Sequence, residues 1–353
     1  MPDLIVAGAG MGGLAAAAQA AELGADVELR EKGDRAGGNM LLSSGVIWRH
    51  RDFERFRAEC PAGDPALQRT VFDRLDADLA WLESLGARPL ARDTGNPLTA
   101  GVRFDTRQLT DALVSAAGGA VRLGDPFTEA PGGVPVVLAT GGFQADRDLV
   151  REHVTAEAGE LVLRATRWST GDGMRIGLEA GAGLSAGMGE FYGRNMPAPP
   201  ARVGEEHFVA LAQLYATHAT VRNARGERYT PTTWSEIDVV QWTARQPGAH
   251  AWYEVADDDL ERRVRDRTIA EMIEAARGAG APVERRGGAT VVEVVAGITT
   301  TLGGLRIGAD ARAAPGVFAC GADVGGIATG GYASGLAAAL VFGRIAARSA
   351  LAQ

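Results

Sequence analysis

The first forty residues constrain this chain more than any other segment. An apolar run is followed by a glycine-rich loop, an alanine-rich stretch and a second apolar run that ends at Glu31. In the loop, Gly8 permits a tight turn, Gly10 lets backbone amides approach a pyrophosphate, and Gly13 lets the following helix pack on the sheet. This order of strand, loop, helix, strand and acid predicts a dinucleotide-binding βαβ unit over residues 3–32.

The acidic residue predicts which dinucleotide binds. A carboxylate at the end of the second strand, here Glu31, can accept hydrogen bonds from both hydroxyls of an adenosine ribose. The same negative charge repels a 2′-phosphate. The ligand is therefore expected to be FAD or NAD rather than NADP.

Composition narrows the class of protein. With 353 residues, 46% hydrophobic and 23% charged, the chain is long enough for two domains or for one domain with a large insertion. The net charge of −8 and the absence of a basic run argue against a nucleic-acid or anionic-membrane partner. The two cysteines, Cys60 and Cys320, lie far apart in the sequence and cannot build a disulfide framework or a metal site, so we expect buried thiols and no metal. The chain begins directly with the binding strand, and Arg344 and Arg348 interrupt the last apolar run, so we expect a cytoplasmic protein.

Local patterns predict the remaining elements. Apolar residues at helical spacing predict packing helices over 65–86 and 106–117, and a last helix is expected over 334–349. Residues 135–142 form the pattern of a buried strand that ends in a glycine turn. The Gly/Ser-rich stretch 35–45 is predicted to be an irregular loop where a second contact to the dinucleotide is made.

A change of composition predicts the domain organisation. Residues 186–285 hold four of the five tyrosines and three of the five histidines. This concentration indicates an inserted α+β cap domain that binds the substrate, although a subdomain with an aromatic core explains it equally well. We therefore expect a nucleotide-binding domain over residues 1–185 and 286–353 and an inserted cap over residues 186–285.

Several ordered motifs resemble the flavoprotein family of soluble fumarate reductases, succinate dehydrogenase flavoprotein subunits and 3-ketosteroid dehydrogenases. The segments that carry the resemblance lie at both ends of the chain: 8–13 with Glu31, 37–45, 138–143, 169–174 with 179–182, 299–305, 315–323 and 330–344. The resemblance implies an α/β fold, with a Rossmann-like FAD-binding domain of the glutathione-reductase type and an inserted cap. It also implies an extended FAD.

The resemblance implies an FAD site residue by residue. The first loop and Glu31 would take the pyrophosphate and ribose, the second glycine loop the flavin, and the segment at Thr140 the adenine half. Asp323, where the family commonly has Glu, would bind the ribityl hydroxyls, and amides at the start of the last helix would face the pyrimidine edge of the ring. The expected cofactor contacts are Gly8, Gly10, Gly12, Gly13, Glu31, Lys32, Gly38, Asn39, Met40, Ser43, Ser44, Gly45, Ala139, Thr140, Gly141, Asp172, Gly321, Asp323, Ser334, Gly335 and Leu336.

The chain also departs from the family pattern. The membrane-complex branch attaches FAD to a histidine just after the second glycine loop, whereas this chain has Asn39-Met40-Leu41, so a noncovalent flavin is expected. The catalytic arginine segment of soluble fumarate reductases has no match, and Gly331-Tyr-Ala-Ser-Gly335 replaces their asparagine- and arginine-containing segment. Both differences weaken the case for a C4-dicarboxylate substrate.

Three residues are candidates for catalysis. Tyr332 precedes the Ser334-Gly335-Leu336 turn, which would hold it near the flavin as a proton-handling or carbonyl-polarising group; alternatively it only packs on the cofactor. Tyr192 is a second candidate acid or base, and Arg194 is a candidate anchor for a carbonyl or carboxylate. The alternative for Arg194 is an ordinary surface side chain.

These residues predict an FAD-dependent dehydrogenase or reductase that interconverts CH–CH and C=C next to a carbonyl, in a cyclic ketone or a carboxylated small molecule. Its partners would be that small molecule and an unidentified electron donor or acceptor. A flavin monooxygenase or amine oxidase shares the first motif and stays open as an alternative. A further alternative is an FAD-bound protein whose short cap has lost chemistry.

Overall fold

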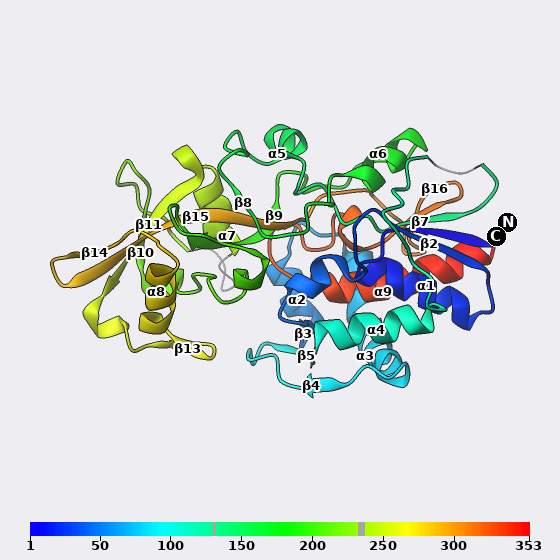
Figure 1. Ribbon diagram of the computed structural model, residues 1–353, viewed down its shortest axis with the longest axis horizontal. Coiled ribbons are helices and arrows are strands. Elements are labelled where there is room, and N and C mark those ends of the chain that lie inside the picture. Colours follow the sequence, from blue (N-terminus) through cyan, green and yellow to red (C-terminus); the bar gives the residue numbers. More distant parts are fainter. Residues whose placement is uncertain (130–131, 232–236) are drawn as a thin grey trace. The chain divides into compact units, whose positions relative to one another are not determined.

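A computed structural model describes residues 1–129, 132–231 and 237–353, and the chain divides into two compact units (Figure 1). The first unit comprises Met1–Asp146, Thr166–Glu190 and Thr300–Gln353, and the second comprises Arg147–Ala165 and Phe191–Thr299. The second unit is thus larger than the cap expected at 186–285. The reason is strand pairing, because β8 (Val162–Leu163) lies parallel to β15 (Ala289–Thr301) and brings the flanking segments into this unit.

The first unit is built on a six-stranded sheet with the order β16-β17-β7-β1-β2-β6. The central pairs are parallel, with Val6 opposite Leu29 on one side and Val137 on the other, and only β16 is antiparallel to its neighbour. The strands are β1 (Leu4–Ala7), β2 (Val27–Glu31), β6 (Arg122–Leu123), β7 (Val136–Leu138), β16 (Arg312–Ala314) and β17 (Val317–Ala319). The predicted βαβ unit is confirmed.

Helices α1 (Met11–Glu22) and α9 (Gly335–Leu351) pack against each other beside this sheet (Figure 1). Small residues allow the contact: a Cβ on Gly343 would lie 2.4 Å from the carbonyl oxygen of Gly12. A Cβ on Gly12 would in turn lie 2.8 Å from the sulfur of Cys320, which is buried like Cys60, as predicted. The other helices of this unit are α2 (Phe53–Glu59), α3 (Pro65–Ser84), α4 (Thr106–Ala116) and α6 (Asp172–Glu179).

A three-stranded antiparallel sheet with the order β3-β5-β4 completes the first unit. Its strands are β3 (Val46–His50), β4 (Pro89–Ala91) and β5 (Thr99–Phe104). Trp48 pairs with Gly101, where a Cβ would lie 2.1 Å from the carbonyl oxygen of Ile47. The prediction of an irregular loop over 35–45 is wrong in part, because Gly38–Leu42, in the segment before β3, forms a 3₁₀ helix. This helix follows Gly37, whose φ is 106°.

The second unit has an antiparallel sheet with the order β10-β11-β15-β14, and β8 and β9 also pair with β15. Its strands, besides β8 and β15, are β9 (Phe191–Pro197), β10 (Thr220–Arg222), β11 (His250–Ala256), β12 (Arg263–Val264), β13 (Arg267–Thr268) and β14 (Val283–Arg286). Its helices are α5 (Arg147–His153), α7 (Ile237–Ala244) and α8 (Ile269–Gly278). Strand β15 organises this unit because β8, β9, β11 and β14 all pair with it, and its valines are buried on both faces of the sheet.

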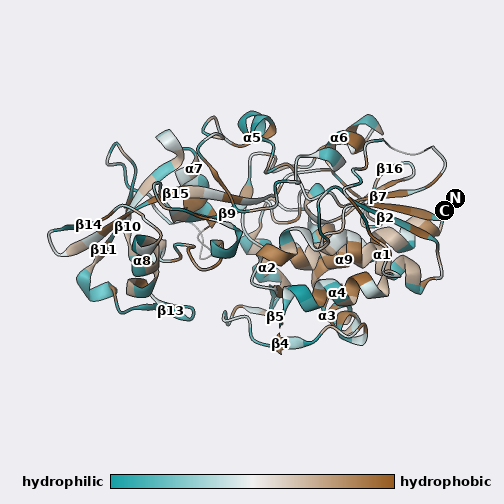
Figure 2. Ribbon diagram, in the orientation of Figure 1, coloured by the Kyte–Doolittle hydropathy of each residue, from teal (hydrophilic) through white to brown (hydrophobic). Residues whose placement is uncertain are grey.

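Hydropathy follows this architecture. Figure 2 shows the central strands of the six-stranded sheet largely in hydrophobic colours, in keeping with the fully buried residues of β1, β7 and β17. Within the described parts of the chain, no helix combines the length and the apolar character needed to span a membrane. The expected α/β fold with a parallel sheet and an additional domain is confirmed.

Candidate functional site

The loop between β1 and α1 has the backbone that the sequence predicts for diphosphate binding. Gly8 adopts a φ of 103°, and a Cβ at this position would lie 2.2 Å from the carbonyl oxygen of Ala139. A Cβ on Gly13 would lie 1.8 Å from the carbonyl oxygen of Gly8. The turn and the close start of α1 therefore both require glycine.

Gly10 leaves the N-terminus of α1 open. It is the N-cap of the helix and provides no side chain to accept hydrogen bonds from the first-turn amides. The first amide bonded within the helix is that of Leu14, which donates to the Gly10 carbonyl over 2.9 Å. A Cβ on Gly10 would meet no atom within 4 Å. Open amides at the positive end of a helix dipole, with free space in front of them, fit a diphosphate.

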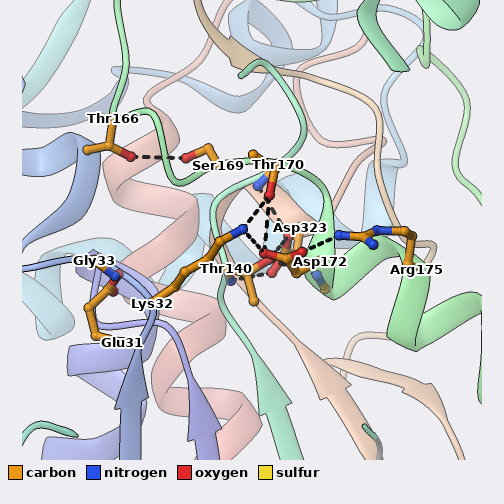
Figure 3. A network of polar contacts seen from close by, with 12 residues as sticks. Glu31, Lys32, Gly33, Thr140, Thr166, Ser169, Thr170, Asp172, Arg175 and Asp323 are labelled. Carbon is orange, nitrogen blue, oxygen red and sulfur yellow. Dashed lines mark hydrogen bonds and ion pairs between the residues drawn. The ribbon is translucent and has the colours of Figure 1, made fainter. Parts of the chain in front are cut away.

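Glu31, the last residue of β2, lies beside this loop. Its Oε2 accepts a hydrogen bond from the Ala9 amide over 2.8 Å. Its Oε1 accepts one from the amide of Gly33 over 2.6 Å, and Figure 3 shows these two residues side by side. Each carboxylate oxygen has two lone pairs, so each keeps one for a further donor. The two amides fix the carboxylate so that it can take the two hydroxyls of an unphosphorylated ribose.

Lys32 joins β2 to the start of α6. Its Nζ donates to Thr170 Oγ1 over 2.6 Å and lies 2.8 Å from Asp172 Oδ2 (Figure 3). Asp172 is the first residue of α6 and also pairs with Arg175. A carboxylate at this end of a helix is favoured by the helix dipole. Lys32 and Asp172 thus neutralise each other next to Glu31.

Asp323 departs from its expected role at the ribityl chain. It is fully buried and accepts hydrogen bonds from the Thr140 amide, from Thr140 Oγ1 over 3.0 Å and from the Gly142 amide over 3.1 Å (Figure 3). Burial raises the pKa of this carboxyl, and the bonds from Gly142 and Thr140 act in the opposite direction. With no exposed surface, the carboxylate is not placed to contact a bound molecule. It instead ties the end of β7 to the turn Gly321–Asp323.

The second glycine loop is held by its own polar atoms. Asn39 Oδ1 accepts a hydrogen bond from the Thr166 amide over 2.8 Å. Ser43 Oγ donates to the Met40 carbonyl over 2.8 Å and accepts from the Gly45 amide over 3.1 Å. Of the other predicted contacts in this loop, Met40 is buried, whereas Ser44 is exposed. The loop therefore leaves Ser44 exposed and directs Met40 into the core, and the flavin contacts of this loop stay a prediction.

The N-terminus of α9 has the form that the sequence predicts. Ser334 is the N-cap, and its Oγ accepts from the Ala337 amide over 3.3 Å and from the Trp48 amide over 3.4 Å. Gly335 is exposed, and a Cβ there would meet no atom within 4 Å. The helix start is therefore bound to β3 and is open to a ligand.

An aromatic cluster surrounds this helix start. The ring centroids of Trp48 and Tyr332 lie 5.3 Å apart at an interplanar angle of 60°, and Trp48 and His50 are also 5.3 Å apart. Sequence reasoning singled out Tyr332 but missed Trp48 and His50. The sequence did contain a signal that could have identified them. A strand directly after the second glycine loop has a two-residue period, and this period places Trp48 and His50 on one face of β3.

The other two catalytic candidates lie in the second unit. Tyr192 and Arg194 are on β9, and the Arg194 guanidinium lies 5.3 Å from the centre of the Tyr192 ring. Arg194 is only 4% exposed, which excludes the alternative of a surface side chain. Tyr332 belongs to the first unit. The assignment of these three residues to one catalytic site stays a prediction.

Comparison with known proteins identifies the family. A family model described as an FAD binding domain matches residues 3–121 and 133–336, which is most of the chain. The chain belongs to this family. FAD is therefore the cofactor of this flavoprotein, and the choice left open between FAD and NAD is decided. The open amides at Gly10 and the carboxylate of Glu31 fit the diphosphate and ribose of FAD.

One curated relative of the flavoprotein is the vinyl phenol reductase of Lactiplantibacillus plantarum. It is 24% identical over 283 residues, and the match covers 64% of this chain and 56% of that protein. The match thus spans little more than half the length of this relative.

Solved structures show the same fold. A flavocytochrome c3 fumarate reductase in an open conformation has a TM-score of 0.74 at 21% identity, covering 99% of this chain and 78% of its own. The 3-ketosteroid delta1-dehydrogenase from Sterolibacterium denitrificans has a TM-score of 0.77 at 14% identity, covering 99% of both chains. The resemblance predicted from the sequence is confirmed, and the flavoprotein has the fold and the cofactor of an FAD-dependent oxidoreductase.

Proposed function

We propose that this flavoprotein is an oxidoreductase that interconverts CH–CH and C=C next to a carbonyl in a cyclic ketone or a carboxylated small molecule. The observation that carries the proposal is the position of Tyr332, which lies two residues before Ser334, the N-cap of α9, and contacts Trp48 in the FAD-binding unit. When bound, FAD accepts or delivers a hydride at N5. The protein must then move a proton on the adjacent carbon, and a tyrosine hydroxyl is a suitable group.

Residues of the chain would bind the cofactor, orient the substrate and transfer the proton. The amides of α1 and the carboxylate of Glu31 would hold the adenosine diphosphate, and the loop with Asn39, Ser43 and Ser44 would line the flavin. Tyr332 would donate a hydrogen bond or a proton to the substrate. Tyr192 is the second candidate for this proton, and the buried guanidinium of Arg194 would anchor a carbonyl or carboxylate oxygen.

A noncovalent flavin is part of the proposal. The support is the sequence Asn39-Met40-Leu41 in the second glycine loop, which has no histidine to carry a covalent bond. Acid precipitation of the purified protein tests this point. Flavin absorbance in the supernatant is expected, and absorbance that stays with the pellet would show a covalent link.

The names of similar proteins support carbon–carbon chemistry. The curated relative is named for the reduction of a vinyl phenol, and the structural neighbours for fumarate reduction and 3-ketosteroid dehydrogenation. Each of these compounds carries or gains a C=C bond conjugated to an oxygen-bearing group. The missing match to the fumarate reductase segments favours a cyclic or aromatic compound over a dicarboxylate. We also propose a separate electron donor or acceptor and a cytoplasmic location. The location is supported by the two buried free cysteines.

An anaerobic screen tests the reaction class. Ketosteroids, cyclic enones, vinyl phenols and fumarate are added to prereduced protein, and the saturated ketones to oxidised protein. Reoxidation or bleaching of the flavin, with formation of the matching saturated or unsaturated product, is expected for one of these classes. Tyr332→Phe should slow this step by about 10²-fold or more, with Tyr192→Phe as the parallel test. In a parallel assay under air that includes amines, substrate hydroxylation or amine oxidation with oxygen uptake would establish the monooxygenase or oxidase alternative. A flavin that is inert to every compound would contradict the proposed reaction class and favour the alternative of a non-catalytic protein.

A further inference from the structure

The peptide groups around Tyr332 are held from two sides within the first unit. Nε2 of His50, on β3, lies 3.4 Å from the Tyr332 carbonyl oxygen. The Tyr332 main chain also hydrogen-bonds to the Cys60 sulfur; this bond opposes the effect of burial, which raises the pKa of the Cys60 thiol to about 12. A Cβ on Gly331 would lie 1.6 Å from the Glu59 carbonyl oxygen, so this segment packs directly on the end of α2. The main chain of Tyr332 therefore has fixed neighbours on both sides.

The chemistry of the carbonyl determines the state of His50. A carbonyl oxygen can only accept, so Nε2 carries the proton when this hydrogen bond forms. Nδ1 is buried and has no hydrogen-bond partner among the described residues. Around it lie the rings of Trp48 and Phe56, each with its centroid 5.3 Å from that of His50. A second proton on Nδ1 would have no acceptor, which favours the neutral imidazole with its proton on Nε2.

The charged groups near His50 do not change this conclusion. Burial lowers the pKa of His50, and the hydrogen bond to Tyr332 raises it. Arg55 of α2 lowers the pKa further, whereas Asp52, the N-cap of α2, raises it. The net direction is downward, in agreement with a neutral ring in a fully buried position.

We propose that His50 is a positioning residue for Tyr332: it donates from Nε2 to the Tyr332 carbonyl and so fixes the direction in which the phenol leaves the main chain. Trp48, on the same face of β3, contacts the phenol ring itself, so one strand holds both the main chain and the ring of Tyr332. The inference rests on the proposed function, because it gives His50 a role in the reaction only through Tyr332.

Two substitutions form a matched pair for the test. His50→Gln and His50→Asn both introduce a neutral carboxamide, but only the longer glutamine side chain brings its amide group about as far as Nε2. Holoprotein labelled with ¹³C in the tyrosine carbonyls gives one signal for each of the five tyrosines. The Tyr332 signal is assigned with Tyr332→Phe. The carbonyl shift is expected to stay near the parent value in His50→Gln and to move in His50→Asn.

Turnover should likewise change less in His50→Gln than in His50→Asn. With the substrate found in the anaerobic screen, His50→Asn is expected to lower kcat by about tenfold to a hundredfold, because a displaced proton donor loses its alignment, while KM changes less. His50→Gln should restore most of kcat. In a Tyr332→Phe background, His50→Asn should add little, because the hydroxyl that it orients is gone.

Three results would contradict the positioning role of His50. Equal effects of His50→Gln and His50→Asn on the Tyr332 carbonyl would show that no hydrogen bond depends on Nε2. A ¹⁵N-histidine spectrum with the His50 proton on Nδ1 would contradict the proposed donor. Losses of kcat that multiply in the double variant would show that His50 acts independently of Tyr332.

The NMR readouts need no substrate, so they distinguish failure of this inference from failure of the proposed function. If no compound reacts with the flavin, the proposed function fails, and the carbonyl shift and the tautomer still decide whether His50 holds Tyr332. If a compound reacts but Tyr332→Phe keeps full turnover, the reaction class stands and the positioning role is overturned.

Discussion

Arg344 of α9 and Asp78 of α3 form an ion pair inside the first unit, where their side chains are only 7% and 2% exposed. The Nε of Arg344 also donates to Gln19 of α1 over 2.9 Å, so three helices meet at one guanidinium. Burial raises the pKa of Asp78, and burial lowers the pKa of Arg344, so each side chain loses hydration that its partner must replace.

Removal of one partner of this pair should therefore destabilise the protein. We expect Arg344→Met to lower the free energy of unfolding by about 3–5 kcal/mol, because it leaves the Asp78 carboxylate buried without its cation. Urea unfolding of parent and variant measures the difference. Arg348→Met is the control, since Arg348 also donates to Gln19 but is exposed on the same helix. Equal and small effects of the two substitutions would contradict a structural role for the pair.

Two glycines of the first loop should respond to alanine in different ways. Gly10 has a φ of −79° and open space at its Cβ position, so Gly10→Ala should keep the apoprotein fold. Its methyl group would enter the space in front of the α1 amides, and FAD affinity should fall by at least about tenfold. Gly13→Ala should instead lower stability by about 1–3 kcal/mol, since its Cβ collides with the Gly8 carbonyl. Fluorescence titration with FAD and apoprotein melting measure these effects, and a Gly10→Ala protein with parental FAD affinity would refute the diphosphate site.

The carboxylate of Glu31 should contribute to FAD binding. Glu31→Gln keeps the shape of the side chain but turns an NH₂ group toward the Ala9 or the Gly33 amide, both of which donate to the carboxylate. We expect the Kd for FAD to rise by about 10- to 100-fold. Glu28→Gln on the same strand is the control, because Glu28 pairs with Arg30 rather than with the loop. Isothermal titration of both variants measures the effect, and equal affinities would exclude the ribose role of Glu31.

Burial of His50 should make stability depend on pH. Because the pKa of His50 in the folded chain lies below its ordinary value of 6.5, the unfolded chain binds a proton near pH 6.5 that the folded chain does not bind. The neutral His50 therefore contributes its full share to the free energy of unfolding above pH 6.5. This contribution is lost as the pH falls toward the lowered pKa, and the free energy of unfolding drops by at most about 1.4 kcal/mol per pH unit.

The comparison of the parent with His50→Gln between pH 7.5 and pH 5, values chosen to bracket this window, isolates the effect of His50. Burial also lowers the pKa of His218, but this residue is present in both proteins and its contribution cancels. The difference in unfolding free energy between the two proteins should shrink as the pH falls. A difference that is independent of pH would mean that His50 titrates normally in the folded protein.

The nucleotide-binding half could be predicted because its signals are local. The turn at Gly8, the open helix start at Gly10 and the carboxylate of Glu31 lie within one βαβ unit, where spacing along the chain fixes spacing in the fold. Ser334 as the N-cap of the last helix follows from the same kind of local rule. The prediction of an irregular loop over 35–45 was wrong because composition does not reveal backbone angles. The φ angles of 106° at Gly37 and 51° at Gly38 allow the chain to form a 3₁₀ helix there.

The sequence by itself thus determined the family resemblance, the FAD-binding unit and Tyr332 as a candidate. Only the tertiary structure decided what surrounds these residues. His50 meets the Tyr332 carbonyl across 282 residues, and Asp323 meets Thr140 across 183 residues, where the expected ribityl contact is replaced by a buried hydrogen-bond network. Strand β15 likewise pairs with β8 and enlarges the second unit beyond the segment of unusual composition. Such contacts depend on which strands pair, in which register and at what burial, and these are properties of the packed chain rather than of any local pattern.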